Sequence, residues 1–281
     1  MEIGKYNVLK VNRRTDNGLY LLDEQTGEEV LLPNKFVSDK MEEGTRGKAF
    51  VYRDSEDRPV ATTQKPLVTA YEAAYLTVKE QSPIGAFLDW GLDKDLLLPF
   101  SEQKSSINPG ARVLVFVYVD RANGRIVATE NLNKFINNKE VNLQKDQEVS
   151  MMVADKNQIG YRVIIENRNW GMIYDNEIFT PVKSGDYLTG FIKKLREDGK
   201  IDVALQKQGI VVADDVREVI LQKLRDNNGQ LNLSDHSTPD EIYAALGISK
   251  KNFKKAIGML YKEKKIQIGE GDIRLAKSNK G

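Results

Sequence analysis

The sequence contains no cysteine and a single histidine among its 281 residues. Without cysteine, the chain forms no disulfide, no zinc–thiolate site and no thiol nucleophile. A histidine-ligated zinc site needs at least two histidines, and a serine–histidine–acid triad would have to use His236. That residue lies in the stretch NLSDHSTPDE, whose Ser, Thr and Asp side chains favour a turn or a helix start. We therefore expect no metal site and no cofactor.

Long apolar runs are also missing. No stretch approaches the 18 apolar residues of a membrane helix, and the start, MEIGKYNVLK, lacks the apolar core of a signal peptide. The 42 basic and 41 acidic side chains nearly cancel, so only the local distribution of charge informs about partners. We expect a cytoplasmic protein that does not contact a membrane.

Signals for catalysis are weak. The sequence has no glycine-rich phosphate loop and no nucleotide-binding fingerprint. Two acidic pairs, Asp93 with Asp95 and Asp214 with Asp215, are candidates for holding magnesium. They fall in a predicted hairpin turn and in the first turn of a predicted helix, where acidic side chains are common for structural reasons. We expect no catalytic residue and no small-molecule substrate.

What the sequence does contain is a hairpin pattern that occurs three times. The three copies are GLYLLDEQTGEEVLLP (18–33), GAFLDWGLDKDLLLP (85–99) and ENRNWGMIYDNEIFTP (166–181). The first two align on their Leu-Leu-Pro ends, and we align the third on its Trp-Gly, which makes Trp170 equivalent to Trp90. Later in the second and third units, Asn123-Gly124 and Asp198-Gly199 favour a turn with positive φ between antiparallel strands.

Each repeat therefore predicts a small all-β domain. A five-stranded sheet that closes on itself leaves no unpaired edge, so we expect three tandem barrels, with a two-layer sandwich as the alternative. The predicted boundaries are 1–64, 65–144 and 145–210. With residues 211–281 added, the expected fold class is mainly β with a C-terminal α+β domain.

The last segment changes from strand to helix periodicity. One helical stripe is predicted from Val212, Val216, Val219, Ile220 and Leu224. TPDEIYAALG reads as a helix that begins with a capping box, Thr238 with Glu241 reaching back to it, and ends at Gly247. SKKNFKKAIGMLYKEKK reads as a second helix capped by Ser249. A hairpin, IQIGEGDIRLA, follows. This order of elements predicts a winged helix-turn-helix.

The last of these helices is rich in lysine. Its buried stripe is predicted to be Phe253, Ala256, Ile257 and Leu260, and residues 249–281 contain ten basic and three acidic side chains. Lys250, Lys251, Lys254 and Lys255 flank that stripe in two rows. Such a face is either a solvated surface or a phosphate-binding surface, and winged helices also bind proteins.

The second unit resembles a known RNA-binding domain. GAF at the start of a strand, followed by a leucine-rich strand and PGARVLVFVYVDRANGRIVAT, is similar to the OB-fold barrel first named in ribosomal protein S-one. In that family, aromatic side chains stack on unpaired bases and basic side chains bind phosphates. The resemblance implies base stacking by Phe87 and by Phe116 or Tyr118, and phosphate binding by Arg125. The family often has a histidine at the end of its third strand, where this sequence has Pro99 or Phe100.

The first and third units resemble the family less closely. In the first, Tyr20 replaces Phe87. The third lacks GAF but offers aromatic candidates beside a basic run: Tyr161, Trp170, Tyr174, Phe179 and Phe191, with Lys193, Lys194 and Arg196. Most of these rings could instead be barrel core. Along the fourth strand of unit two, Phe116 and Tyr118 alternate with valines, which predicts that the two rings face outward. The two tryptophans are expected to be either stacking platforms or plugs at the barrel ends.

Three such units and a C-terminal winged helix resemble the conserved virulence factor B family, also called YitL-like proteins. The resemblance implies an RNA-binding regulator of bacterial gene expression, with single-stranded RNA as the partner and other nucleic acid as a second partner of the winged helix. Two alternatives remain: a protein-interaction scaffold, and a duplex-DNA regulator that acts through the winged helix. The expected RNA-binding residues are Phe87, Phe116, Tyr118, Arg125, Tyr161, Trp170, Lys193, Lys194, Arg196, Lys250, Lys251, Lys254 and Lys255.

Overall fold

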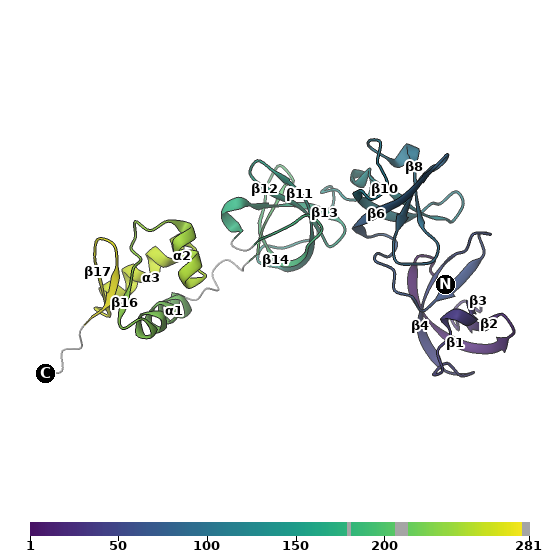
Figure 1. Cartoon of the computed structure of the whole chain (residues 1–281), viewed down its shortest axis with the longest axis horizontal. Coiled ribbons are helices and arrows are strands. Elements are labelled where there is room, and N and C mark those ends of the chain that lie inside the picture. The colour runs from purple at the N-terminus through teal and green to yellow at the C-terminus, as the bar shows by residue number, and fades with distance from the viewer. Residues whose placement is uncertain (179–180, 206–212, 277–281) are drawn as a thin grey trace.

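The computed structural model describes residues 1–178, 181–205 and 213–276. Three closed five-stranded barrels are followed by a helical domain with a small sheet (Figure 1). In Figure 1, barrel 3 lies between barrel 2 and the C-terminal domain, and barrel 1 packs beside barrel 2. The predicted fold class, mainly β with a C-terminal α+β domain, is confirmed, and closed barrels rather than sandwiches form. The barrel strands lie within residues 5–62, 73–129 and 148–204.

All three barrels have the strand order of an OB-fold. Barrel 1 comprises β1 (Lys5–Thr15), β2 (Gly18–Leu22), β3 (Glu29–Pro33), β4 (Arg46–Arg53) and β5 (Pro59–Thr62). Barrel 2 comprises β6 (Ala73–Ser82), β7 (Gly85–Asp89), β8 (Leu96–Pro99), β9 (Arg112–Val119) and β10 (Ile126–Thr129). Barrel 3 comprises β11 (Glu148–Asn157), β12 (Gly160–Ile165), β13 (Asn169–Tyr174), β14 (Tyr187–Leu195) and β15 (Ile201–Ala204). In each barrel the third and fifth strands pair in parallel and the other pairs are antiparallel.

The second strand of every barrel begins with a glycine, at a position where there is no room for a side chain. Gly18, Gly85 and Gly160 have φ values of 145°, 153° and 153°. A Cβ at these positions would lie 2.1, 2.3 and 2.0 Å from a carbonyl oxygen of the third strand. Only glycine permits so close an approach between the two strands. These glycines therefore fix which residues of the three barrels are equivalent.

The glycine register corrects one alignment made from the sequence. Gly85 pairs with Pro99, and Gly160 pairs with Tyr174. Trp90 follows the second strand of barrel 2, whereas Trp170 lies on the third strand of barrel 3. The predicted equivalence of the two tryptophans is wrong, because the third hairpin starts at Gly160 rather than at Glu166.

Trp90 joins the cores of barrels 1 and 2. Its side chain is 2% exposed and belongs to one continuous apolar cluster with Phe50 of β4. The two rings meet edge to face, with centroids 5.8 Å apart. The indole N–H donates to the carbonyl oxygen of Lys94 at 2.5 Å. Of the two roles considered for Trp90, the structure shows the plug.

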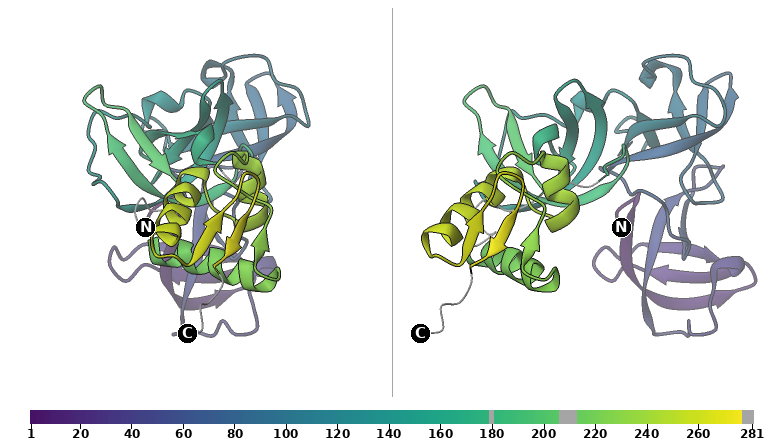
Figure 2. Two further views of the ribbon diagram at one scale, coloured as in Figure 1. Left: turned by 90° about the vertical axis from the view of Figure 1, so that its left-hand side faces the viewer. Right: turned by 60° about the vertical axis from the view of Figure 1, so that its left-hand side comes forward.

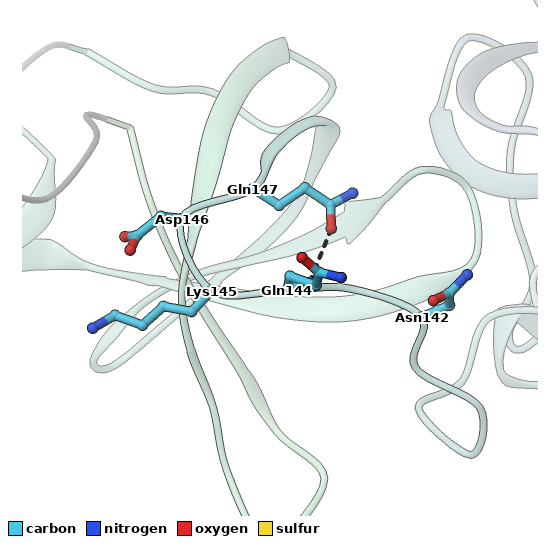
Figure 3. Close-up of a pocket in the computed structure, with 5 residues that line it drawn as sticks. All are labelled: Asn142, Gln144, Lys145, Asp146 and Gln147. Atoms are coloured by element: carbon cyan, nitrogen blue, oxygen red, sulfur yellow. Dashed lines mark hydrogen bonds between the residues drawn. The ribbon is translucent and has the colours of Figure 1, made fainter.

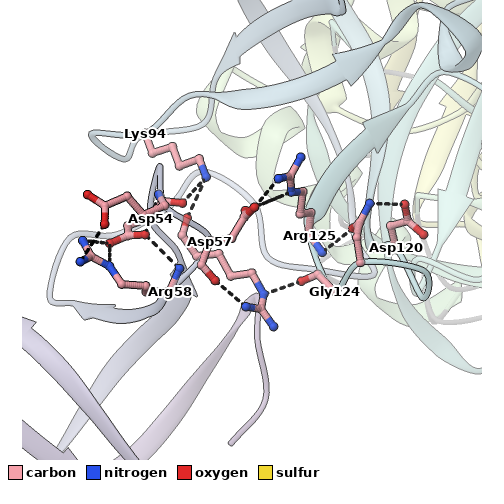
Figure 4. Close-up of polar contacts among 10 residues, drawn as sticks. Asp54, Asp57, Arg58, Lys94, Asp120, Gly124 and Arg125 are labelled. Carbon is pink, nitrogen blue, oxygen red and sulfur yellow. Dashed lines mark hydrogen bonds and ion pairs between the residues drawn. The ribbon is translucent and has the colours of Figure 1, made fainter.

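Equivalent loops of barrels 1 and 2 also face one another (Figure 4). Arg125, in the loop before β10, forms a two-pronged ion pair with Asp57, in the loop before β5. Arg53 donates to the carbonyl oxygen of Gly124 at 3.0 Å. Lys94 donates to two backbone carbonyl oxygens of barrel 1, and burial lowers its pKa. The two barrels are therefore fastened by polar contacts around the shared core.

The C-terminal domain is a winged helix (Figure 2). Its elements are α1 (Ala213–Asp226), β16 (Gln230–Leu231), α2 (Pro239–Leu246), α3 (Lys250–Lys262), β17 (Ile266–Ile268) and β18 (Ile273–Leu275). Thr238 and Glu241 form the predicted capping box, Gly247 ends α2 with φ 66°, and Ser249 caps α3.

The apolar stripe of α1 differs from the prediction at one residue. Val216, Ile220 and Leu224 are buried, but Val219 is 43% exposed and Leu221 is buried instead. Predicted stripe member Val212 lies outside the described residues. The buried residues of α1 pack against α3. The position of α3 therefore determines which side chains of α1 are covered. Among the described residues, no helix is both long and apolar enough to cross a membrane.

Candidate nucleic-acid interface

An exposed apolar surface lies on barrel 2 beside the glycine that opens β7. Along β7, Ala86 and Leu88 point into the core, so Phe87 points outward, where it is half-buried. It pairs across the sheet with Leu97 of β8. Phe100, directly after β8, is 53% exposed, and Ile84, directly before β7, is 59% exposed. We call Ile84, Phe87, Leu97, Pro99 and Phe100 the barrel 2 face.

Phe100 and Ile84 are neighbours as well as exposed. The backbone N–H of Phe100 approaches the carbonyl oxygen of Ile84 at 3.4 Å. Phe100 is one of the two residues that replace the family's histidine at the end of the third strand, and Pro99 is the residue that pairs with Gly85. The barrel 2 face therefore keeps an aromatic ring next to the position where that histidine is expected.

The equivalent ring of barrel 1 is covered. Tyr20 takes the place of Phe87, and the Arg13 guanidinium carbon lies 3.8 Å from the centre of its ring. Arg13 is held in turn by Glu29 at 2.9 Å. Barrel 1 thus presents a charge over its aromatic ring rather than a bare stacking surface.

Barrel 3 carries a row of large side chains along β13. Trp170, Met172 and Tyr174 alternate outward and are half-buried. We call these three residues the barrel 3 face. Arg162 of β12 has its guanidinium carbon 4.2 Å from the Trp170 ring centre, and Arg196 donates to the Tyr174 hydroxyl at 2.7 Å. As on barrel 1, an arginine therefore lies over a ring, and Trp170 also packs against the cluster between barrels 2 and 3. What this surface offers to an unpaired base is the planar guanidinium group together with the uncovered edges of the rings.

Both arginines of this face are oriented by carboxylates. Asp155 binds Arg162 through two hydrogen bonds, of 3.1 and 2.6 Å. Asp202, 6% exposed, accepts from Arg196 at 2.9 Å and raises the pKa of that arginine. Sequence reasoning missed Arg162, although alignment on Gly160 would have placed it at the position of Phe87.

Phe116 and Tyr118 of β9 face outward as predicted, but barrel 3 and the connecting segment cover them. Phe116 is 3% exposed and stacks on Phe135, with ring centres 4.6 Å apart and planes at 12°. Tyr118 also packs against Phe135, with ring centres 4.8 Å apart. Met152 and Ile164 of barrel 3 complete this cluster. Contact of a base with Phe116 would require the junction to open.

The other barrel residues that the sequence predicts to bind RNA differ in whether they already have a partner within the protein. Arg125 is engaged with Asp57, and Lys193 is ion-paired with Glu177. Lys194 is exposed and forms no ion pair within the described part of the chain. Tyr161 packs at the rim of the barrel 3 core, with the Lys156 ammonium 5.3 Å from its ring centre. Phe179 lies outside the described residues.

The lysines of α3 form the basic surface that the sequence predicts. Phe253, Ala256, Ile257 and Leu260 are buried, which confirms the predicted apolar stripe. Lys251, Lys254 and Lys255 are exposed and Lys250 is half-buried. Lys254 lies 3.9 Å from Asp235, and across residues 213–276 the other three lysines form no ion pair. These ammonium groups are available to an anionic ligand.

Two other features bear on ligand binding. A hollow of about 560 Å³ before β11 is lined by Asn142, Gln144, Lys145, Asp146 and Gln147 (Figure 3). Its side chains come from one polar segment and include no aromatic ring. In the part of the chain that the structure describes, no group of three or more His, Asp or Glu side chains is placed to hold a metal ion.

Comparison with known proteins identifies the domain types. An S1 domain model matches residues 3–64 and 72–131, which are barrels 1 and 2, and a CvfB-like winged helix domain model matches residues 218–275. These are nucleic-acid-binding and regulatory domain types and not enzyme families.

Several whole proteins are similar over nearly their full length. Uncharacterized protein YitL of Bacillus subtilis is 28% identical, over 96% of this chain and 93% of that protein. Conserved virulence factor B of Staphylococcus aureus is 28% identical, over 92% of this chain and 89% of that protein. A crystal structure of a multidomain protein with nucleic acid binding domains from Streptococcus pneumoniae covers 97% of this chain and 98% of its own, at 24% identity and a TM-score of 0.40. The chain belongs to the conserved virulence factor B family, with S1 domains in its barrel region and a CvfB-like winged helix at its C-terminal end.

Proposed function

We propose that this protein binds single-stranded RNA without catalysing a reaction, and that it regulates gene expression post-transcriptionally in the bacterial cytoplasm, where its ligand occurs. The observation that carries the proposal is the barrel 2 face, where Phe100 is 53% exposed and Phe87 points outward from β7. An exposed ring on this part of an OB-fold has no packing role and is suited to stack on a base.

The proposed contacts divide into stacking and charge. The barrel 2 face and the barrel 3 face supply rings, and Arg162 and Arg196 supply planar cations beside them. Each stacked base contributes on the order of 1–3 kcal/mol. The lysines of α3 supply the phosphate contacts, and Lys194 adds one on barrel 3. Several weak surfaces on one chain raise the overall affinity through effective concentration.

The regulatory role is supported by family membership and by the name of the staphylococcal relative, conserved virulence factor B. The proposed RNA preference is supported by the S1 domain matches. It is also supported by the aromatic side chains of the two faces, because unpaired RNA bases stack on such rings. An exposed apolar patch such as Ile84 with Phe100 also suits a protein partner, which makes a protein scaffold the second candidate.

The test is fluorescence anisotropy of labelled single-stranded RNA, single-stranded DNA and duplex DNA, titrated with the full chain at several salt concentrations. We expect the tightest binding to single-stranded RNA. The double variant Phe87→Ala with Phe100→Ala should weaken it by about 5-fold to 150-fold or more, because stacking is lost. The variant Lys251→Ala with Lys255→Ala should reduce the salt slope of log K by about 1.4, because two single-strand phosphate contacts are removed.

Ile159→Ala is the matched control. Ile159 occupies on barrel 3 the position that Ile84 occupies on barrel 2, and it is 54% exposed, but it is not part of either face. Its loss should leave RNA affinity unchanged. If the wild type binds none of the three nucleic acids, the proposal is wrong and the scaffold role is favoured. A clear preference for duplex DNA would instead favour a regulator that acts through the winged helix.

A further inference from the structure

A cleft of about 400 Å³ lies where the three barrels meet. Barrel 1 contributes Lys5, the segment between barrels 1 and 2 contributes Tyr71 and Glu72, and Phe135 comes from the segment between barrels 2 and 3. The turn between β12 and β13 contributes Asn167 and Arg168. The volume is in the range of small-molecule sites, about 300–1,000 Å³, and the mixture of rings with a few polar groups is also typical of them.

Two aromatic rings form the apolar part of the cleft. Phe135 is half-buried and is fixed by its stack on Phe116. Tyr71 is 52% exposed, and its φ of 67° is unusual for a bulky residue. The Tyr71 N–H donates to the carbonyl oxygen of Val117 at 2.6 Å, which holds the backbone in this conformation. A strained, exposed aromatic at a cleft is a feature that often accompanies ligand binding.

The polar groups of the cleft include two cations without a carboxylate partner. In the described part of the chain, neither Lys5 nor Arg168 forms an ion pair. Lys5 donates to the Thr69 hydroxyl at 3.0 Å, and its ammonium lies 5.9 Å from the Tyr71 ring centre. Two cations at the edge of an aromatic cleft are suited to bind a phosphate.

The acidic and amide groups of the cleft are held by single backbone hydrogen bonds. Glu72 accepts from the Thr69 N–H at 2.9 Å, and Glu166 accepts from the Ser150 N–H at 2.6 Å. Asn167 accepts from the Ala73 N–H at 3.0 Å, which leaves its amide nitrogen as a donor. These groups can therefore both donate to and accept from the edge of a heterocyclic base.

We propose that this cleft binds one nucleotide, with its base against Tyr71 and Phe135 and its phosphate between Lys5 and Arg168. The nucleotide is either one unit of an RNA strand or a free mononucleotide. In the first case the inference rests on the proposed function and extends the RNA path to the junction of the three barrels. In the second it stands independently.

The experiment compares two ligands on the full chain: a labelled single-stranded RNA, followed by anisotropy, and the four nucleoside 5′-monophosphates, followed by calorimetry. Tyr71→Ala should weaken binding of at least one of them by about 5-fold to 150-fold, because base stacking is lost. Tyr71→Phe should retain binding. Lys5→Ala with Arg168→Ala should lower the salt slope by about 1.4 for RNA.

Two controls separate ligand contact from backbone effects. Leu67→Ala changes a 64%-exposed side chain in the same connecting segment and should leave both affinities unchanged. Tyr71→Gly removes the ring but permits positive φ, so it should bind as weakly as Tyr71→Ala if the ring matters, and like the wild type if only the backbone does.

The outcomes distinguish this inference from the proposed function. Loss of RNA binding in Tyr71→Ala supports the strand, and loss of monophosphate binding alone supports a free nucleotide. Wild-type RNA binding with no effect of Tyr71→Ala on either ligand overturns the cleft but not the proposed function. Tyr71-dependent monophosphate binding without RNA binding overturns the proposed function but not the cleft. Binding of neither ligand overturns both.

Discussion

The two junctions between barrels are built from different parts of the same fold. Barrels 1 and 2 meet through equivalent loops, with Arg125 bound to Asp57, around a core that Trp90 shares with Phe50. Barrels 2 and 3 meet through the outer face of β9, where Phe116 is covered by Phe135. One junction is a plug with a polar rim, and the other is a covered sheet face.

The difference teaches that an outward aromatic ring is not by itself a binding surface. Phe87 and Phe116 both point away from the barrel 2 core, yet only Phe87 remains uncovered by a neighbouring barrel. The side of barrel 2 that packs on barrel 3 is used for assembly, and the proposed ligand surface lies on the side of β7 and β8. The following predictions test how much each junction contributes to the stability of the chain.

The largest effect is expected at the plug. Trp90→Ala should destabilise the barrel 1–barrel 2 unit by about 3–5 kcal/mol, because it leaves a cavity in a shared core. Calorimetric unfolding of the full chain measures this. Trp170→Ala is the matched control: its ring is half-buried, so the loss should be about 1–2 kcal/mol. Equal losses for the two tryptophans would show that Trp90 is not the plug.

A smaller effect is expected at the barrel 2–barrel 3 junction. The Asn138 side chain donates to the carbonyl oxygens of Trp170 and Gly199, each at 2.9 Å, and accepts from the Trp170 N–H at 2.8 Å. Asn138→Ala should cost about 1–3 kcal/mol, because it leaves these backbone groups without partners. Hydrogen exchange of the Trp170 amide should accelerate. Asn133→Ala, which removes only a bond to the Trp170 indole at 3.0 Å, should leave that amide protected.

The smallest effect is expected at the polar rim and depends on pH. Hydrogen bonds from Arg125 lower the pKa of Asp57 below its ordinary value of 3.8. A lowered folded-state pKa gives stability that is present above the unfolded pKa and is lost as pH falls through the folded value. The wild type should therefore unfold at a higher temperature than Asp57→Asn at pH 7, and the gap should narrow below about pH 4. If the difference in unfolding temperature does not change with pH, it does not come from the charge of Asp57. Because both side chains are exposed, the effect should be modest.

Local patterns predicted most of the fold. The three barrels, the winged helix, the capping box of Thr238 and the buried stripe of α3 all follow from short-range sequence signals. The alternation along β9 also predicted that Phe116 faces outward. The cover over Phe116 was not predictable, because it comes from Phe135 and barrel 3, and no periodicity within β9 records a contact with a distant segment.

The errors have similar physical causes. Trp90 and Trp170 are each followed by a glycine, which suggested that they are equivalent. The register is set instead by the backbone pairing of Gly85 and Gly160, and a glycine gives a weaker sequence signal than a tryptophan. Val219 lies on the predicted apolar stripe of α1, on a side of the helix that α3 does not cover. Of the candidate site, Phe87 and the α3 lysines were proposed from the sequence, and an alignment on Gly160 would have added Arg162. The junction cleft depends on tertiary structure, because its residues come from distant segments.

The glycine that opens each second strand has a consequence for engineering. Because Gly18, Gly85 and Gly160 each approach an equivalent carbonyl of the third strand, the segments Gly18–Pro33, Gly85–Pro99 and Gly160–Tyr174 begin and end at equivalent backbone pairs. The three hairpins therefore share their ends but not their interiors, because the second also contains Trp90, which packs on barrel 1. Exchanging the interior of one hairpin for that of another would therefore change the outward side chains of a barrel while keeping the backbone pair that anchors it.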